Sequence, residues 1–136
     1  MIIEPKKIRP VFTQILTTMY KYPQDMMVGG VVDTTRRKGD VSAYQQVIAV
    51  GNVVRTVEKG EWIQINPMRY AKFKHEKGSL KDGVIKDNPI LGFDFPVVTI
   101  GGEKYMLLDE RDISVVIDEF EEVKFSDIVI PELIEK

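Results

Sequence analysis

The sequence predicts an all-β fold, in the form of a small, irregular β-barrel. Its apolar runs are short and rich in β-branched residues, which favour strands. Reversals containing glycine, proline or charged residues separate these runs, as they do in hairpins. A chain of 136 residues with 43% hydrophobic content can bury a core without disulfides. We expect one domain with its core at about 8–118, a long loop at about 22–43, an insertion at about 68–96 and a C-terminal extension at 119–136.

The barrel is predicted to centre on residues 44–65. Two apolar runs, 47–54 and 62–65, read as strands joined by a polar reversal at 58–61. Gly51 and Asn52 interrupt the first run, so a bulge or a close backbone approach is expected there.

The first predicted strand lies within residues 8–22. Threonine and β-branched residues favour a strand, although the spacing of Val11, Ile15 and Met19 also fits a short amphipathic helix. Pro10 suggests an edge position or the start of the strand, because proline cannot donate a ladder hydrogen bond.

The loop at 22–43 carries an apolar patch at 26–32 within polar surroundings. A connection of this length in a small domain is uncommon and is often functional. One interpretation is a strand or β-arm that folds back on the barrel; the other is a peptide-like segment that docks on a partner by adding a strand or filling a groove. The basic residues Arg36, Arg37 and Lys38 are expected at the loop tip.

Further strands are expected after the central unit. Residues 67–96 look like an irregular insertion on the outside of the barrel, followed by a hairpin in which Gly101 and Gly102 connect 97–100 to 105–108. A turn at 109–112 leads to a closing strand at 113–117, which ends in the acidic run 118–122. The extension is apolar enough that we expect it to pack on this subunit or on a neighbour.

Composition argues against several classes of function. The net charge of −2 gives no electrostatic reason for binding nucleic acid or an anionic membrane, and the absence of cysteine removes thiolate chemistry. The single histidine, His75, has no partner for a triad or a metal site, and the carboxylates at 109–119 are expected to form a solvated acidic corner. No phosphate-binding glycine motif is present, so we expect no enzyme activity, cofactor or metal. No apolar run is long enough to span a bilayer, so a soluble cytoplasmic or virion protein is expected.

Several stretches taken in order resemble the GroES-type co-chaperonins. Residues 8–11, IRPV, are similar to the opening IRPL strand of that family, and 29–32, GGVV, to its GGIVL loop motif. Residues 47–52, VIAVGN, are similar to VLAVGNG, and 59–63, KGEWI, to the turn and strand VGDIV. Residues 102–108 and 109–117 resemble the ending GEEYLIL and ESDILAIVE. Each motif is weak alone, but five in the family's order make the resemblance specific for the fold.

The resemblance implies a non-enzymatic ring subunit that caps a chaperonin through a mobile loop and assists protein folding. The loop residues that would contact the chaperonin are Met27, Val28, Gly29, Gly30, Val31 and Val32. The first strand of one subunit would pair with the last strand of its neighbour, which places at the subunit interface Arg9, Pro10, Val11, Phe12, Ser114, Val115, Val116 and Ile117.

Four departures from the family pattern favour an alternative. Asp33 occupies the third apolar position of the loop motif, and a carboxylate there weakens docking because it must be desolvated. The roof hairpin of the family is shortened, residues 68–96 mostly lack a counterpart, and the chain continues past the usual end. Additions of this kind also suit a divergent, virus-encoded member of the family that serves as a chaperonin lid. The alternative is a phage structural protein, for example a capsid-associated, connector or tail subunit, whose loop and C-terminal segment act as arms between subunits.

Overall fold

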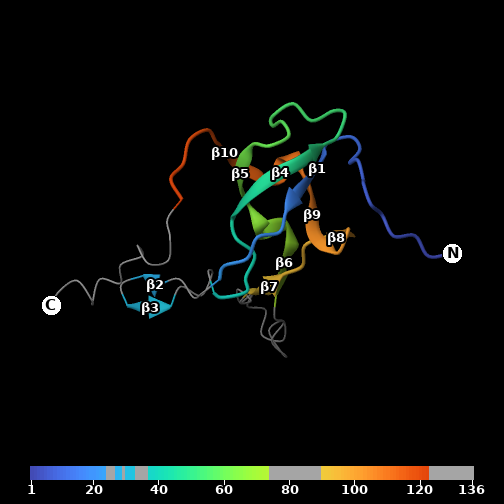
Figure 1. The fold of residues 1–136 in the computed structure, drawn as a ribbon. Helices are drawn as coiled ribbons and strands as arrows, with labels where there is room; N and C mark the ends of the chain where they lie inside the picture. Colours follow the sequence, from blue (N-terminus) through green and yellow to red (C-terminus); the bar gives the residue numbers. More distant parts are fainter. Residues whose placement is uncertain (24–26, 29, 33–36, 74–89, 123–136) are drawn as a thin grey trace, which may run out of the picture.

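The computed structural model describes residues 1–23, 27–28, 30–32, 37–73 and 90–122, and this part of the chain is all-β. The strands are β1 (Gln14–Thr18), β2 (Met27–Val28), β3 (Val31–Val32), β4 (Tyr44–Val50), β5 (Trp62–Ile65), β6 (Ala71–Phe73), β7 (Ile90–Phe93), β8 (Val97–Ile100), β9 (Glu103–Asp109) and β10 (Ile113–Ile117). Two short 3-10 turns, η1 (Pro67–Tyr70) and η2 (Glu110–Asp112), connect strands (Figure 1). The predicted all-β class is confirmed.

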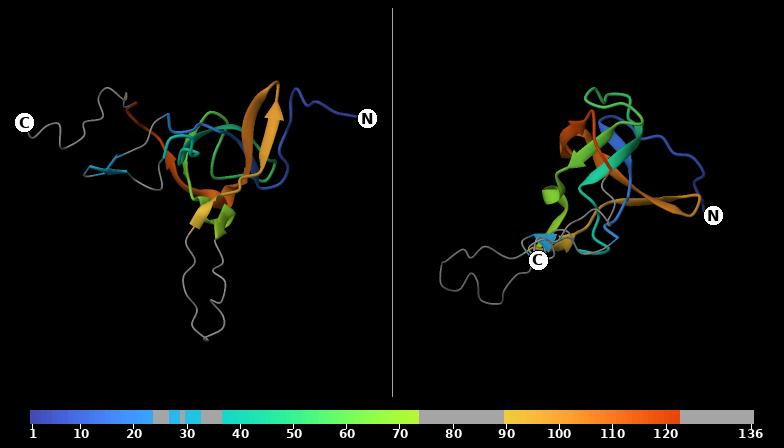
Figure 2. Two further views of the ribbon diagram at one scale, coloured as in Figure 1. Left: turned by 90° about the horizontal axis from the view of Figure 1, so that it is seen from below. Right: turned by 60° about the vertical axis from the view of Figure 1, so that its left-hand side comes forward.

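Six strands form one antiparallel sheet in the order β10-β5-β4-β1-β9-β8. The pairs β2–β3 and β6–β7 are separate two-stranded ribbons, and Figure 2 shows β6–β7 at one end of the body. Among the described residues, β8 and β10 are the two end strands of the large sheet and no ladder joins them. Closure of the sheet into a barrel therefore stays a prediction.

The core follows the two-residue period of the strands. Met106 and Leu108 of β9 and Ile63 and Ile65 of β5 alternate with more exposed residues, so each strand turns one row of side chains inward. The buried apolar cluster comprises Ile15, Val47, Val57, Ile63, Ile65, Met106 and Leu108.

The sheet is pinned at the end of β4 by a close approach of two backbone segments. A Cβ atom added to Gly51 would overlap the carbonyl group of Phe12, so only glycine fits there. The Gly51 N–H donates to the Gln14 carbonyl at 2.8 Å, and the Phe12 N–H donates to Asn52 Oδ1 at 2.9 Å. The predicted close approach at Gly51 and Asn52 is confirmed.

Two strands differ from their predicted bounds. Residues 8–13 precede β1 because Phe12 and Thr13 form a turn, which the hydrogen bond from the Gln14 N–H to the Val11 carbonyl closes at 3.1 Å and in which Phe12 has a left-handed φ of 56°. The alternative of a helix over this stretch is wrong, since β1 lies between β4 and β9. The strand predicted at 47–54 runs from Tyr44 to Val50 instead, because the backbone leaves the ladder at Gly51 to approach Phe12.

The insertion is also more regular than predicted. Residues 67–96 contain η1 and the paired strands β6 and β7, with Ala71 opposite Phe93, rather than irregular chain alone. The alternation of apolar and polar residues that marks a strand is not visible in this stretch, because it is rich in lysine, glycine and aspartate. Residues 74–89, which contain His75, lie outside the described residues.

The remaining strands match their predictions closely. β5 and β10 have the predicted bounds, and β8 and β9 form the predicted hairpin, with β9 longer by two residues at its start and one at its end. Gly101 and Gly102 both have positive φ, 58° and 85°, as a tight two-residue hairpin turn requires.

Candidate partner-binding site

The long loop leaves the body through two extended segments, around Lys21 and Val41, that pair with each other. The Ser42 N–H donates to the Tyr20 carbonyl at 2.8 Å, and the Tyr22 N–H donates to the Asp40 carbonyl at 2.9 Å. Lys21 and Val41 form a β-bridge between these two bonds. We call this paired segment the stem of the loop.

Gln45 fastens both sides of the stem from inside the body. Its side chain is fully buried, and its Oε1 accepts hydrogen bonds from Thr18 Oγ1 and from the Tyr20 N–H, each at 2.8 Å. Its Nε2 donates to the carbonyls of Tyr20 at 2.9 Å and Ser42 at 2.8 Å. These four bonds use every donor and acceptor site of the amide, so Gln45 holds the outgoing and returning chain at one fixed spacing.

The predicted partner-binding residues form a hairpin beyond this stem. Met27 pairs with Val32 and Val28 with Val31, which makes β2 and β3 a short antiparallel ribbon. Gly30 takes a positive φ of 85° in the turn, and the Val31 side chain is 69% exposed. Gly29 lies outside the described residues. The apolar patch is thus a β-arm, and Val31 is an apolar side chain that it presents to solvent.

The basic residues do not all lie where the sequence placed them. Arg37 and Lys38 belong to the returning side of the loop, since the Asp40 N–H donates to the Arg37 carbonyl and Gly39 bonds to Tyr22. The Arg37 N–H in turn donates to Asp40 Oδ2 at 3.0 Å. The prediction that they form the loop tip is wrong for these two residues, because this turn ties them to the stem; Arg36 lies outside the described residues.

An open cavity of about 1000 Å³ lies between the stem of the loop and the β6–β7 ribbon. Met19, Val41, Ile65 and Phe95 supply apolar lining, and Lys21 and Asp40 are charged groups of the stem side.

The predicted interface residues Arg9, Pro10, Val11 and Phe12 lie just before β1. Pro10 is buried and anchors the segment, whereas Val11 and Phe12 are exposed, Phe12 to 67%. A left-handed backbone at a bulky residue is strained, and it is held here by the two hydrogen bonds that link Phe12 to Asn52 and Val53. The Phe12 side chain is therefore exposed to solvent while its own backbone is strained.

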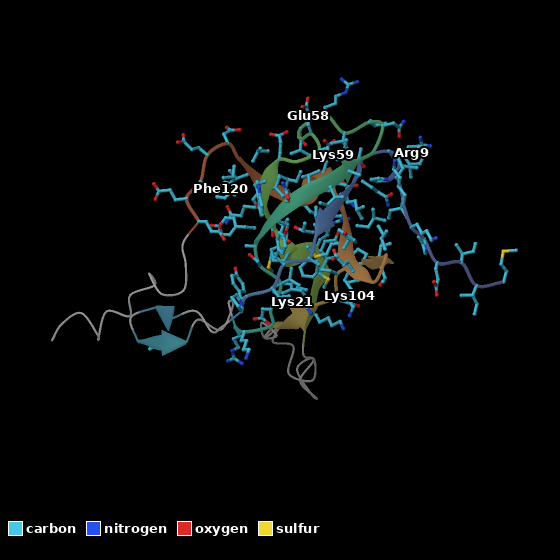
Figure 3. The ribbon with its side chains drawn as sticks, in the orientation of Figure 1. Arg9, Lys21, Glu58, Lys59, Lys104 and Phe120 are labelled. Carbon is cyan, nitrogen blue, oxygen red and sulfur yellow. The ribbon has the colours of Figure 1, made fainter. Side chains whose placement is uncertain are left out.

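The other predicted interface residues form β10. This strand pairs with β5 on one side and is an end strand of the sheet on the other. Ser114 and Val115 are exposed, Ile117 is half-buried, and Val116 packs against the core. Figure 3 places Arg9 and Phe120, which lies three residues beyond the end of β10, on opposite sides of the molecule.

A buried carboxylate, which the sequence did not predict, joins η1 to η2. Asp112 is 3% exposed and accepts from Arg69 Nε and Nη2, each at 2.8 Å, and from the Tyr70 hydroxyl at 2.6 Å. Burial opposes its ionisation, yet these hydrogen bonds hold the pKa of Asp112 below its ordinary value. Burial and the bond to Asp112 raise the pKa of Tyr70 to about 12. Asp112 is therefore a structural anchor.

The prediction of a solvated acidic corner is wrong for Asp112, whereas Glu110 stays at the surface and has hydrogen-bond partners there. Asp112 is buried, and Glu110 accepts from the backbone N–H groups of Arg55 and Thr56, which with the Thr56 side chain lowers the pKa of Glu110. The one feature of the sequence that could have indicated a structural role for Asp112 is its spacing from Asp109, with which it forms a capping box around η2.

The structure also contains an aromatic cluster that the sequence did not predict. Tyr20 stacks on Trp62 with ring centroids 5.9 Å apart, and Phe120 tilts against Trp62 at 5.4 Å. These residues come from three distant parts of the sequence, so only the fold brings them together. Tyr20 and Phe120 are exposed, and we name the three rings the aromatic face.

Within the described residues no group of three or more histidine, cysteine or acidic side chains is arranged to hold a metal ion. In the same part of the chain no helix has the length and apolar character needed to cross a membrane. A scan against protein-family models and a search of curated proteins each find no match to this chain.

Proposed function

We propose that the protein is a co-chaperonin-like ring subunit, which caps a chaperonin through the loop residues Met27 to Val32 and assists folding without chemistry of its own. The observation that carries the proposal is the β2–β3 hairpin at the end of a paired stem. Any ATP hydrolysis belongs to the chaperonin.

The loop has properties that suit docking into an apolar groove. Pairing of Met27 with Val32 restricts the apolar tip before it binds, which lowers the entropy cost of ordering it. The exposed Val31 gives it an apolar anchor. Gln45 holds the stem, so binding at the tip is transmitted to the body at a fixed position.

Two exposed segments support assembly into a ring. The exposed residues Val11 and Phe12 and the end strand β10 lie at different places on the subunit, so a contact between them repeats from head to tail. Such a contact forms a ring when the rotation closes. It also covers the outer edge of β10, on which no strand of the described residues pairs and which is otherwise available for unwanted pairing.

A pull-down tests the loop contact. The wild-type protein is mixed with a chaperonin in its nucleotide-bound state and compared with Val31→Asp, which places a charge on the apolar tip. Val97→Asp is the matched control, because Val97 is an exposed valine of β8, outside the loop. We expect capture of the wild type and the control, with at least tenfold less of Val31→Asp. Failure of the wild type to associate refutes the proposed function.

A phage structural subunit is the second candidate. It is favoured by the β6–β7 ribbon, a second two-stranded unit that is separate from the main sheet and that could contact a neighbouring subunit. Asp33 in the loop motif also fits this candidate better. Mass spectrometry of purified particles distinguishes the two: the protein is present at a fixed copy number per particle if it is structural, and absent if it acts only as a co-chaperonin.

A further inference from the structure

The open cavity beside the stem leaves large apolar side chains uncovered. At its rim the Met68 side chain is 51% exposed and the Phe93 side chain is 38% exposed. Its volume of about 1000 Å³ is at the upper end of the range of about 300–1,000 Å³ that small-molecule pockets occupy, so a segment of polypeptide suits it better. Four of its lining residues belong to the hydrophobic core or pack against it, which are Met19, Val41, Ile65 and Phe95.

The sequence beyond residue 122 supplies an apolar segment. Residues 123–136 lie outside the described residues, and half of these fourteen residues are apolar. Proteins rarely leave this much apolar surface in contact with water, so the segment needs a surface to cover it. Its apolar residues are Val123, Phe125, Ile128, Val129, Ile130, Leu133 and Ile134.

The 123–136 segment begins close to the cavity. The ring of Phe120 packs on Trp62 at 5.4 Å between centroids, and Trp62 stacks on Tyr20 at 5.9 Å. The neighbours of Tyr20 in the chain, Met19 and Lys21, both line the cavity. Fourteen extended residues can span about 46 Å. Since a compact body of 100 residues has a radius of gyration of about 13 Å, the segment is long enough to reach the cavity and fill it.

The charged groups of the cavity favour an occupant that carries carboxylates. Lys21 and Arg37 line its stem side, and both side chains are exposed. The two lining carboxylates are already engaged, because Asp40 accepts from the Arg37 N–H at 3.0 Å and Asp94 lies 3.7 Å from Lys72 Nζ. The other apolar candidate, the β2–β3 hairpin, lies beyond the stem and away from the body in Figures 1 and 2.

We propose that the 123–136 segment folds back and docks in the cavity of its own subunit, where its apolar residues cover the exposed rim. Glu132 and Glu135 flank an apolar pair of the segment. When this pair enters the cavity, the two carboxylates lie at the rim beside the cations of the stem. Because stem residues form one wall of the cavity, docking also steadies the base of the loop. The contact goes beyond the proposed function and does not depend on assembly into a ring.

Thiol labelling tests whether the segment covers the cavity. The chain has no cysteine, so Met68→Cys introduces one thiol at the rim. The disrupting variant adds Ile128→Asp and Ile130→Asp, which lie on one side of an extended segment. Its matched control adds Lys124→Ala and Ser126→Asp, which change the net charge equally and keep every apolar residue. We expect alkylation at position 68 to become about fivefold faster or more in the disrupting variant, and not in the control, because the reaction follows access to the thiol.

Photo-cross-linking locates the docked segment. A benzophenone is attached to Ile130→Cys, and the residues that it captures on illumination are identified by mass spectrometry. We expect links within one chain to the lining segments 65–68, 92–97 or 39–43. The same label on Lys59→Cys is the control and should not reach these segments, since Figure 3 shows Lys59 and Lys21 at opposite ends of the body.

The stem gives a third readout. The Tyr22 N–H, which donates to the Asp40 carbonyl at 2.9 Å, should exchange faster when Ile128→Asp and Ile130→Asp are present. Circular dichroism checks that each variant folds.

Other results assign the cavity to a different occupant and overturn the proposal. Equal alkylation at position 68 in the unchanged, disrupting and control segments means that the segment does not cover the rim. Protection that disappears on dilution, or cross-links between two chains, assigns the cavity to the segment of a second copy. Cross-links confined to other surfaces place the segment elsewhere. Chaperonin capture is measured separately through Val31, so its failure leaves this contact standing.

Discussion

Removing the amide of Gln45 should loosen the loop stem and destabilise the fold. Gln45→Met keeps a side chain of similar size but loses four hydrogen bonds, to Thr18, Tyr20 and Ser42. At about 1 kcal/mol each, the loss is about 4 kcal/mol. The Tyr20 carbonyl still accepts from the Ser42 N–H, which limits the penalty for unpaired groups. Because domains are stable by about 5–15 kcal/mol, the variant should fold but be markedly weakened.

Urea unfolding followed by the fluorescence of Trp62, the single tryptophan of the chain, measures this loss. Gln46→Met is the control, since Gln46 makes one exposed side-chain bond, to the Gly60 carbonyl, and should cost less than about 1 kcal/mol. Amide exchange at Tyr22 and Ser42 should also become faster in Gln45→Met. If this variant unfolds within 1 kcal/mol of the control and its stem amides stay protected, Gln45 does not hold the loop.

Three further predictions concern other anchors. Asp112→Asn should lose about 2 kcal/mol at pH 7 through its bonds to Arg69. Since the folded pKa of Asp112 is depressed, its stabilisation is present above about pH 4 and disappears as the pH falls through the folded pKa, so acid unfolding curves of the two proteins should converge. Gly51→Ala should cost about 2 kcal/mol or more in thermal unfolding, while Gly92→Ala, with open space around it, should cost little. Phe12→Asn should relieve the left-handed backbone and stabilise the isolated subunit by about 1 kcal/mol, yet weaken its assembly in sedimentation; equal or stronger assembly contradicts a role in the interface.

Local sequence was sufficient where neighbouring residues alone set the conformation. The pair Gly101 and Gly102 determined a tight hairpin, and the β-branched run of β10 determined a strand with its observed bounds. Gly51 signalled a close approach, although only the fold identified Phe12 as the group that approaches it.

Local sequence was insufficient where distant contacts decide. The strand expected over residues 8–22 begins only at Gln14, because hydrogen bonds to Asn52 and Val53 hold Phe12 in a turn. In the candidate site, the apolar tip was visible as a run of valine, methionine and glycine. The stem could not be predicted, because Tyr20 and Ser42 are joined by Gln45, which the sequence does not distinguish from its half-buried neighbour Gln46.

The sequence by itself therefore determined the all-β class, most of the strands and the position of an apolar loop, since strand period, β-branching and turn residues act over a few positions. Only the tertiary structure decided which polar groups are buried and which apolar groups are displayed. Gln45 and Asp112 lie inside because partners far along the chain satisfy their hydrogen bonds, and Phe12 points outward because strained backbone holds it there. Burial and pairing depend on contacts between distant segments, which no local pattern encodes.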